Sequence, residues 1–255
     1  IWESLGQLLA TGDRRAVETF VRGLPPGDTP RLLARLTASE RTRLLALLAP
    51  QDAASLLEQV PDAQSADILA KLEPPTAAEI VNTMPSNAQA DVLGELHPDE
   101  ADAVLRVMDP DEAADAKRLV QYADDTAGGV MLTEYLAFPE TVTVKAVLDD
   151  LRSNTETYRR HDVQYIYITT AGNLLKGVLR LRDLVLAEGN QPVREIMIPD
   201  AHAVDVSTPL SDLQDFFATH PYRGVPVVDK RHRLAGVVRH ADVAEALEEQ
   251  VASDH

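Results

Sequence analysis

Acidic side chains are the residues of this sequence best suited to bind a ligand, and their number points to hard cations. Between Asp52 and Asp115 there are fifteen Asp or Glu residues, against only Lys71 and Arg106. Carboxylates are common ligands of divalent cations in proteins. The formal net charge of the whole chain is −17. Nucleic-acid binding needs clustered Lys and Arg, so we expect no nucleic-acid partner.

The residues that usually perform catalysis are missing or isolated, so the sequence indicates a protein that is not an enzyme. There is no Cys, which excludes disulfides and a Cys nucleophile. The seven His residues form no His-x-x-x-His pair, and neither a Gly-x-Ser-x-Gly motif nor a phosphate-binding loop occurs. Gly128 and Gly129 are not followed by Lys-Ser or Lys-Thr, and their sequence is more typical of a tight junction.

The elements that must position the acids begin with a repeat in the first half. An apolar residue followed closely by Pro, Asp or Ser recurs about every twelve residues, at Leu24, Leu36, Leu48, Val60, Leu72, Met84, Leu96 and Met108. Each step predicts a helix of about ten residues, with Pro or an acid in its first turn. Helices so short must stack on one another to bury their apolar faces. We expect an armadillo-like superhelix with Leu44, Leu45, Leu56, Leu57, Ile68 and Leu69 in its core.

A second, different repeat follows Tyr122. The segment from Tyr165 to Leu179 matches the segment from Gly224 to Val238 at an offset of 59 residues, and each predicts a strand, a turn and a strand. An amphipathic helix precedes each copy, with Thr143 as the cap of one and Thr208, followed by Pro209, as the cap of the other. The predicted order is strand, helix, strand, hairpin turn, strand, helix, twice over.

These repeats resemble a tandem pair of CBS domains over about residues 130–248. Joined to the helical ladder through the junction from Tyr122 to Met131, the arrangement is similar to the cytoplasmic region of MgtE-type magnesium transporters. The resemblance implies an α plus α/β fold, with an armadillo-like helical domain at 1–122, CBS domains at 123–196 and 197–250, and a tail at 251–255. It also implies a homodimer through the CBS domains at the cytoplasmic face of the cell membrane. The transporter's membrane pore domain would be a partner, and it is absent from this sequence.

The resemblance further implies that Mg²⁺ is held by acids at the interface between the helical domain and the CBS pair. The positions that match are Asp99, Asp242 and Glu245, with the carbonyl of Gly128 as a further ligand. Asp102 is added because it lies one helical turn from Asp99, as Glu245 does from Asp242, so that each pair faces one way. The predicted function is Mg²⁺-dependent gating, in which cations between the domains relieve the mutual repulsion of the acids.

The alternative function is an adenine-nucleotide sensor. Tandem CBS domains often bind ATP or AMP. In such domains an Asp lies six residues after the glycine of the second hairpin strand, and a Ser or Thr lies three residues after that glycine. Here the acids are present at Asp183 and Asp242, but Arg180 and Arg239 stand at the hydroxyl positions. An Arg can contact phosphate but cannot accept a hydrogen bond from ribose. In this alternative the helical repeat docks an unrelated protein.

The longest apolar runs of the sequence are shorter than the roughly 20 residues that a membrane-spanning helix needs.

Overall fold

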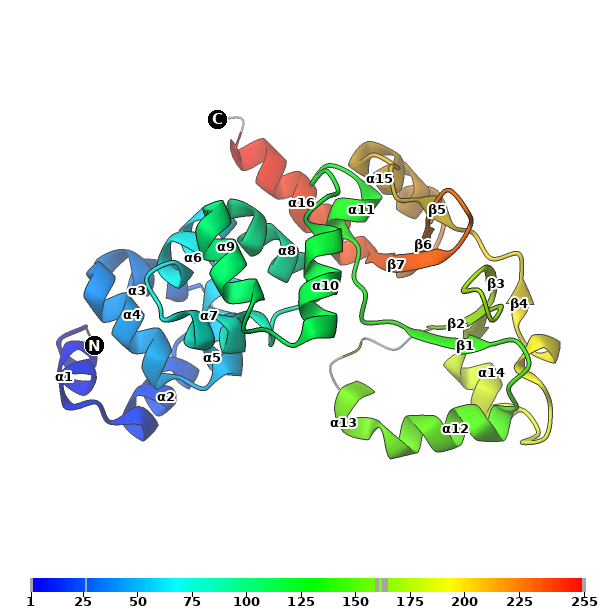
Figure 1. The fold of residues 1–255 in the computed structure, drawn as a ribbon, viewed down its shortest axis with the longest axis horizontal. Coiled ribbons are helices and arrows are strands. Elements are labelled where there is room, and N and C mark those ends of the chain that lie inside the picture. Colours follow the sequence, from blue (N-terminus) through cyan, green and yellow to red (C-terminus); the bar gives the residue numbers. More distant parts are fainter. Residues whose placement is uncertain (1, 26, 159–160, 162–164, 254–255) are drawn as a thin grey trace. The chain divides into compact units, whose positions relative to one another are not determined.

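The computed structural model describes residues 2–25, 27–158, 161 and 165–253, and the chain divides into two compact units (Figure 1). Unit 1 runs from Ile1 to Gln121, and unit 2 runs from Tyr122 to His255. The two units differ in architecture and are built from different sequence repeats, so each is described by itself.

Unit 1 consists of short helices, and seven of them begin at intervals of twelve residues. After α1 (Trp2–Thr11), α2 (Arg14–Arg22) and α3 (Thr29–Arg35) come α4 (Ala38–Leu47), α5 (Pro50–Leu57), α6 (Asp62–Leu69), α7 (Pro74–Val81), α8 (Ser86–Glu95), α9 (Pro98–Leu105) and α10 (Pro110–Leu119). Proline opens α5, α7, α9 and α10, where its missing N–H removes no helical hydrogen bond. The predicted ladder is confirmed, with helices of eight to ten residues.

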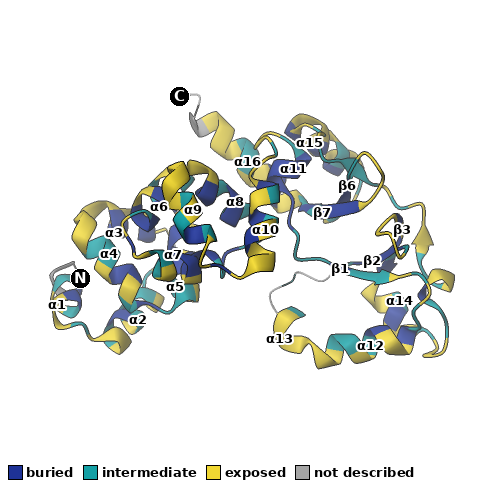
Figure 2. Ribbon diagram, viewed as in Figure 1, coloured by how far each residue is buried: buried dark blue, intermediate teal, exposed yellow. Residues whose placement is uncertain are grey.

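Alternate helices of unit 1 pack against one another, which explains how helices of two turns can be stable. One row runs α4, α6, α8 and α10, and the other runs α5, α7 and α9. The six predicted core residues are all at most 3% exposed. The matching positions of later helices, such as Ile80, Val81, Val92 and Leu93, join the same apolar cluster. Figure 2 shows buried segments along α6, α7 and α8. The stacked array with a shared core therefore follows from the repeat, as predicted.

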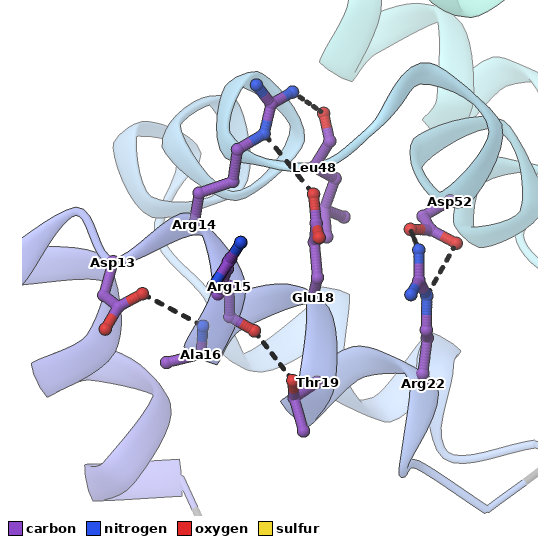
Figure 3. A network of polar contacts seen from close by, with 9 residues as sticks. All are labelled: Asp13, Arg14, Arg15, Ala16, Glu18, Thr19, Arg22, Leu48 and Asp52. Atoms are coloured by element: carbon purple, nitrogen blue, oxygen red, sulfur yellow. Dashed lines mark hydrogen bonds and ion pairs between the residues drawn. The ribbon is translucent and has the colours of Figure 1, made fainter.

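Two arginines of α2 attach the start of the chain to this array (Figure 3). The Arg14 guanidinium donates to the Leu48 carbonyl over 3.2 Å, at the end of α4. The Arg22 guanidinium donates to both carboxylate oxygens of Asp52, at 2.8 and 3.4 Å, in the first turn of α5. The hydrogen bond and the charge of Asp52 raise the pKa of Arg22. These contacts join residues 30 and 34 positions apart, so no local pattern in the sequence indicates them.

Unit 2 contains two copies of the same strand and helix order. The first copy is β1 (Leu136–Pro139), α12 (Val144–Ser153), α13 (Thr155–Tyr158), β2 (Tyr165–Thr169), β3 (Leu175–Arg180) and α14 (Leu181–Leu186). The second is β5 (Val204–Asp205), α15 (Leu210–Thr219), β6 (Gly224–Val228), β7 (Leu234–Arg239) and α16 (His240–Ser253). In each copy the first two strands pair in parallel and the hairpin strands pair antiparallel. The predicted order is confirmed.

The offset of 59 residues extends to details of the backbone. Each hairpin has a register shift, between Ile168 and Thr169 in the first copy and between Val227 and Val228 in the second. Each turn also contains a residue in the left-handed region, Asn173 with φ 62° and His232 with φ 60°. The turns bind each other, because the Leu175 N–H donates to the His232 carbonyl and the Leu234 N–H to the Asn173 carbonyl. The two copies therefore meet at their hairpins about an approximate two-fold relation.

The short segments before each copy pair with the other copy. Leu132 of the junction pairs with Val237 of β7, whereas β4 (Ile198–Pro199), which follows η1 (Val193–Glu195), pairs with β3 of the first sheet. Both crossings pass over a glycine: a Cβ on Gly236 would lie 2.7 Å from the Met131 sulfur, and a Cβ on Gly177 would lie even closer to the Ile198 carbonyl oxygen. The linear division into residues 123–196 and 197–250 stays a prediction, and hydrogen bonds cross it in both directions.

One of the two expected helix caps is wrong. The Thr143 hydroxyl accepts from the Ala146 N–H at the start of α12, as predicted. At α15, however, the N-cap is Pro209, and Thr208 lies outside the helix. The Thr208 carbonyl accepts a 2.7 Å hydrogen bond from the Ala127 N–H instead. This hydrogen bond connects the Thr208 backbone to α11 (Ala127–Val130) of the junction, a long-range contact that no local capping pattern indicates.

Candidate functional site

The two acids expected in unit 1 lie on α9 and are open to solvent. Asp99 occupies the first turn of this helix, with a side chain that is 96% exposed. The His97 Nδ1 atom lies 4.0 Å from an Asp99 carboxylate oxygen. Asp102, one turn further on, is also exposed. Both carboxylates can therefore take a hydrated cation without breaking an internal contact.

The acids expected on α16 differ from each other in their surroundings. Glu245 is exposed, whereas Asp242 is only 6% exposed. Both carboxylate oxygens of Asp242 accept hydrogen bonds from the Arg239 guanidinium, over 2.6 Å from Nη2 and 2.8 Å from Nε. The Arg239 backbone N–H adds a third contact of 3.3 Å. A cation at Asp242 would have to compete with a bidentate, charge-assisted pair.

Gly128 is buried in the junction helix α11, which packs against β5, β7 and α16. Its N–H donates to the Val206 carbonyl over 2.8 Å. A Cβ at this position would lie 2.5 Å from the Tyr122 ring, so a residue without a side chain is needed here. Gly128, Asp242 and Glu245 therefore lie on neighbouring elements of unit 2.

The ligand types fit Mg²⁺, which prefers oxygen atoms and retains much of its water. Within unit 1 and unit 2, over the residues described, no three Asp, Glu or His side chains are grouped so that they alone could hold a metal ion. The five predicted ligands thus divide into Asp99 and Asp102 in unit 1 and the other three in unit 2. Their assignment to one shared site stays a prediction.

The four residues of the predicted nucleotide site also differ between the copies. In the second copy, Arg239 and Asp242 bind each other, as described above. In the first copy, the Asp183 side chain is 31% exposed and lies 3.5 Å from Arg182, measured between a carboxylate oxygen and Nε. Arg180 is exposed and stands at the N-cap of α14. The Asp183 carboxylate is therefore more accessible to a ligand than that of Asp242.

A group of stacked rings in the second copy was not predicted. His220 lies parallel to Phe216, with ring centroids 4.4 Å apart, and also stacks with Tyr222 at 5.6 Å. His202 approaches His220 to 5.0 Å. The spacing of Phe216 and His220 by four residues on one helix was an available signal, but the loop residues Tyr222 and His202 gave none. These histidines pack against neighbouring aromatic rings.

Comparison with known proteins finds similarity along almost the whole chain. A family model described as the MgtE intracellular N domain matches residues 24–125, and a model described as the CBS domain matches residues 193–249. A crystal structure of the cytosolic domain of the Mg²⁺ channel MgtE in complex with ATP is 32% identical, with a TM-score of 0.84. The match covers 96% of this chain and 99% of that one. The soluble part of a magnesium transporter, at 23% identity and a TM-score of 0.81, has the same fold.

Curated relatives point to the same group of proteins. The magnesium transporter MgtE of Thermus thermophilus is 38% identical over 149 residues, which are 57% of this chain and 32% of the transporter. The transporter of the same name from Enterococcus faecalis is 28% identical over 145 residues, with the same two shares. The matched region spans about a third of the length of these relatives. Among the helices of the described residues, none combines the length and the apolar character that crossing a membrane requires.

Proposed function

Because the chain belongs to the MgtE family of magnesium transporters, and is not an enzyme, we propose that it senses Mg²⁺ and regulates a transporter's pore. In this proposal, Mg²⁺ at Asp99 and Asp102 of unit 1 and at Gly128, Asp242 and Glu245 of unit 2 favours a compact arrangement of the two units. The chain works at the cytoplasmic face of a membrane, as a homodimer through its CBS domains and with a membrane pore domain as its partner. Nucleic acid has no part in it.

The observation that carries the proposal is the match of both units to the cytosolic domain of an Mg²⁺ channel. The charge distribution supports it, because acids are concentrated in the second half of unit 1. Asp99, Asp102 and Glu245 are exposed and can meet a hydrated ion.

Electrostatics supplies the driving force. Two carboxylates about 6 Å apart repel each other by roughly 3 kcal/mol at an effective dielectric constant of 20, and by less when exposed and screened by salt. Without divalent cations, the acids of the two units therefore keep the units apart. A cation between them changes repulsion into attraction. Several weak sites together can reach the roughly 10⁴-fold preference that reverses a two-state equilibrium.

Small-angle X-ray scattering tests the proposal directly. We expect the radius of gyration of the full chain to fall on addition of millimolar Mg²⁺. A variant with Asp99, Asp102 and Asp242 changed to Asn and Glu245 to Gln should lose most of this change. The matched control changes four exposed acids elsewhere, Glu73, Glu79, Glu156 and Glu195, to Gln, and should keep it. An equal response of both variants to Mg²⁺ would contradict the proposal.

Limited proteolysis of the junction is a second test of the proposed function. Ala123, Asp124 and Asp125 are exposed, whereas residues 127–130 are buried, so cleavage should be confined to the exposed residues. Protection of this segment by Mg²⁺ supports a cation-driven compact state. Protection by ATP or AMP alone supports the alternative function.

A nucleotide site is the second candidate function, because the similar cytosolic domain was crystallised with ATP. In this chain the candidate residues are Arg180 and Asp183 in one copy and Arg239 and Asp242 in the other. The more exposed Asp183 favours the first copy. Calorimetric titration with ATP and AMP should show binding that Asp183→Asn weakens at least about tenfold, equivalent to about 1.4 kcal/mol. Titration without heat or saturation for either nucleotide would exclude this function.

A further inference from the structure

His202 and His220 lie side by side in the second copy, although they are far apart in the sequence. Their ring centroids are 5.0 Å apart and their planes are inclined at 56°. His220 is the C-cap residue of α15, and His202 precedes β5. The fold therefore brings together two imidazoles, and imidazole nitrogen is a ligand that suits Zn²⁺, Cu²⁺ and Ni²⁺.

The separation of the two rings fits one shared metal ion. A Zn–N bond of about 2.0–2.1 Å places the centre of a bound imidazole about 3.2 Å from the metal. With a tetrahedral angle at the metal, two such rings have centres about 5.2 Å apart. The observed separation of 5.0 Å is close to this value, so a shared ion requires no large displacement of either ring.

A hydrogen bond of His220 places a lone pair on its other ring nitrogen. The Nδ1 atom lies 3.0 Å from the Phe216 carbonyl oxygen. A carbonyl can only accept, so Nδ1 carries the hydrogen and donates it, and the lone pair of the neutral ring is on Nε2. Histidines that bind metals almost always donate their second ring N–H in this way, which fixes the tautomer and the orientation of the ring.

Two aromatic rings support both imidazoles. His220 stacks with Phe216 and Tyr222, at centroid distances of 4.4 and 5.6 Å. His202 contacts the same two rings, at 6.2 and 6.0 Å. Ligands that packing already holds in place lose less conformational freedom when an ion binds. The His202 side chain is exposed and that of His220 is half-buried, so an ion can reach the pair from solvent.

The end of α15 also favours a positive charge. The unpaired carbonyl groups of the last turn form the negative end of the helix dipole, and His220 directly follows that turn. The helix itself contains Asp212 and Asp215 but no Lys or Arg. A divalent cation bound to His220 is therefore stabilised by the electrostatic field of its own helix.

The first copy shows that the fold does not require this pair of rings. Helix α15 follows the equivalent α12 at an offset of 66 residues, because the two helices begin at 210 and 144. At this offset Phe216 and His220 correspond to Asp150 and Asn154. The Asn154 amide donates to the Asp150 carboxylate over 2.9 Å. The imidazole and its supporting ring are therefore features of the second copy and not of the repeated framework.

We propose that His202 and His220 bind one divalent transition-metal ion of the Zn²⁺ type, with water completing its coordination. Within the part of the chain that the structure describes, no third Asp, Glu or His side chain completes a group with these two. The ion is therefore exchangeable, unlike the ion of a structural zinc site with four protein ligands. Nitrogen ligands do not suit Mg²⁺, which prefers oxygen. The inference is therefore independent of the proposed Mg²⁺ sensing.

Calorimetric titration of the full chain with Zn²⁺, in a millimolar excess of Mg²⁺ that occupies carboxylate sites, tests the pair. His202→Gln and His220→Gln should each weaken Zn²⁺ binding at least about tenfold, equivalent to about 1.4 kcal/mol. The control His240→Gln changes another exposed histidine of the second copy, whose ring stacks with Phe217, and should bind Zn²⁺ as the wild type does. Absence of Zn²⁺ binding by the wild type, or equal binding by all three variants, overturns the proposal.

Electron paramagnetic resonance with Cu²⁺ as the probe identifies the ligands directly. The wild-type spectrum should show coupling of the copper electron to two imidazole nitrogens, and each single variant should show coupling to one. Circular dichroism establishes that the variants remain folded, as substitutions of partly exposed side chains should. A wild-type spectrum with oxygen ligands alone overturns the site even if the chain binds the metal elsewhere.

Discussion

Asp242 is predicted to have two competing roles, and the change Asp242→Asn separates them. Its carboxylate is held by the Arg239 guanidinium over 2.6 and 2.8 Å and is 6% exposed. An Asn keeps the shape but directs amide hydrogens toward the guanidinium donors. Hydrogen bonds to charged groups contribute about 1.5–3 kcal/mol, and the partial exposure of Arg239 reduces this to about 1–2 kcal/mol.

For a unit of roughly 130 residues, this loss corresponds to a decrease in melting temperature of about 3–8 °C. Circular dichroism of thermal unfolding in EDTA measures it. The control is Asp183→Asn, the equivalent position of the first copy, which is more exposed and lies 3.5 Å from its arginine neighbour. We expect the control to change the melting temperature by less than a third as much. Equal effects of the two changes would refute the reasoning from the bidentate pair.

The pairing of Arg239 with Asp242 also predicts the direction in which Mg²⁺ affinity should change. If Asp242 is a ligand, Arg239 competes with the cation, and Arg239→Met should tighten Mg²⁺ binding while lowering stability without metal. Release of about 1–2 kcal/mol of pairing energy corresponds to about a 5- to 30-fold lower apparent dissociation constant. Arg180→Met removes the same charge from the first copy and should have a much smaller effect. Calorimetric titration with Mg²⁺ measures both, and identical shifts would show that Asp242 binds no cation.

Three further predictions concern the framework of unit 2. Gly128→Ala should destabilise the chain by about 1–3 kcal/mol in denaturant unfolding, because the new Cβ would lie 2.5 Å from the Tyr122 ring. His232→Gly should raise the unfolding free energy by about 0.5–1 kcal/mol, because a non-glycine residue is strained at φ 60°. Hydrogen bonds from the hydroxyl and N–H of Ser207 lower the pKa of Asp205. The contribution of the Asp205 carboxylate to the free energy of unfolding is therefore complete at pH values above the ordinary carboxyl pKa. It is lost as the pH falls through the lower pKa of Asp205 in the folded state. Asp205→Asn should flatten the stability profile below about pH 4.

Local pattern predicted most of the framework because the interactions that form it are local or repeated. The twelve-residue ladder fixed the start of each helix from α4 to α10, since a proline or acid and an apolar stripe recur in every step. The offset of 59 residues identified both hairpins for the same reason. The features that local pattern did not predict depend on residues far apart in the sequence. Arg22 and Asp52 are 30 positions apart. The carbonyl of Thr208, the residue expected to cap α15, accepts a hydrogen bond from the distant Ala127 N–H.

The candidate site shows a second limit of sequence reasoning. A carboxylate on a helix face looks the same in a sequence whether it is free or paired, and Asp99 and Asp242 were predicted together as ligands. The structure leaves Asp99 exposed but pairs Asp242 with Arg239, three residues before it. That spacing was visible, but Arg180 and Asp183 have the same spacing and a different environment. Burial, which depends on the packing of the whole copy, determines which of the two pairs closes.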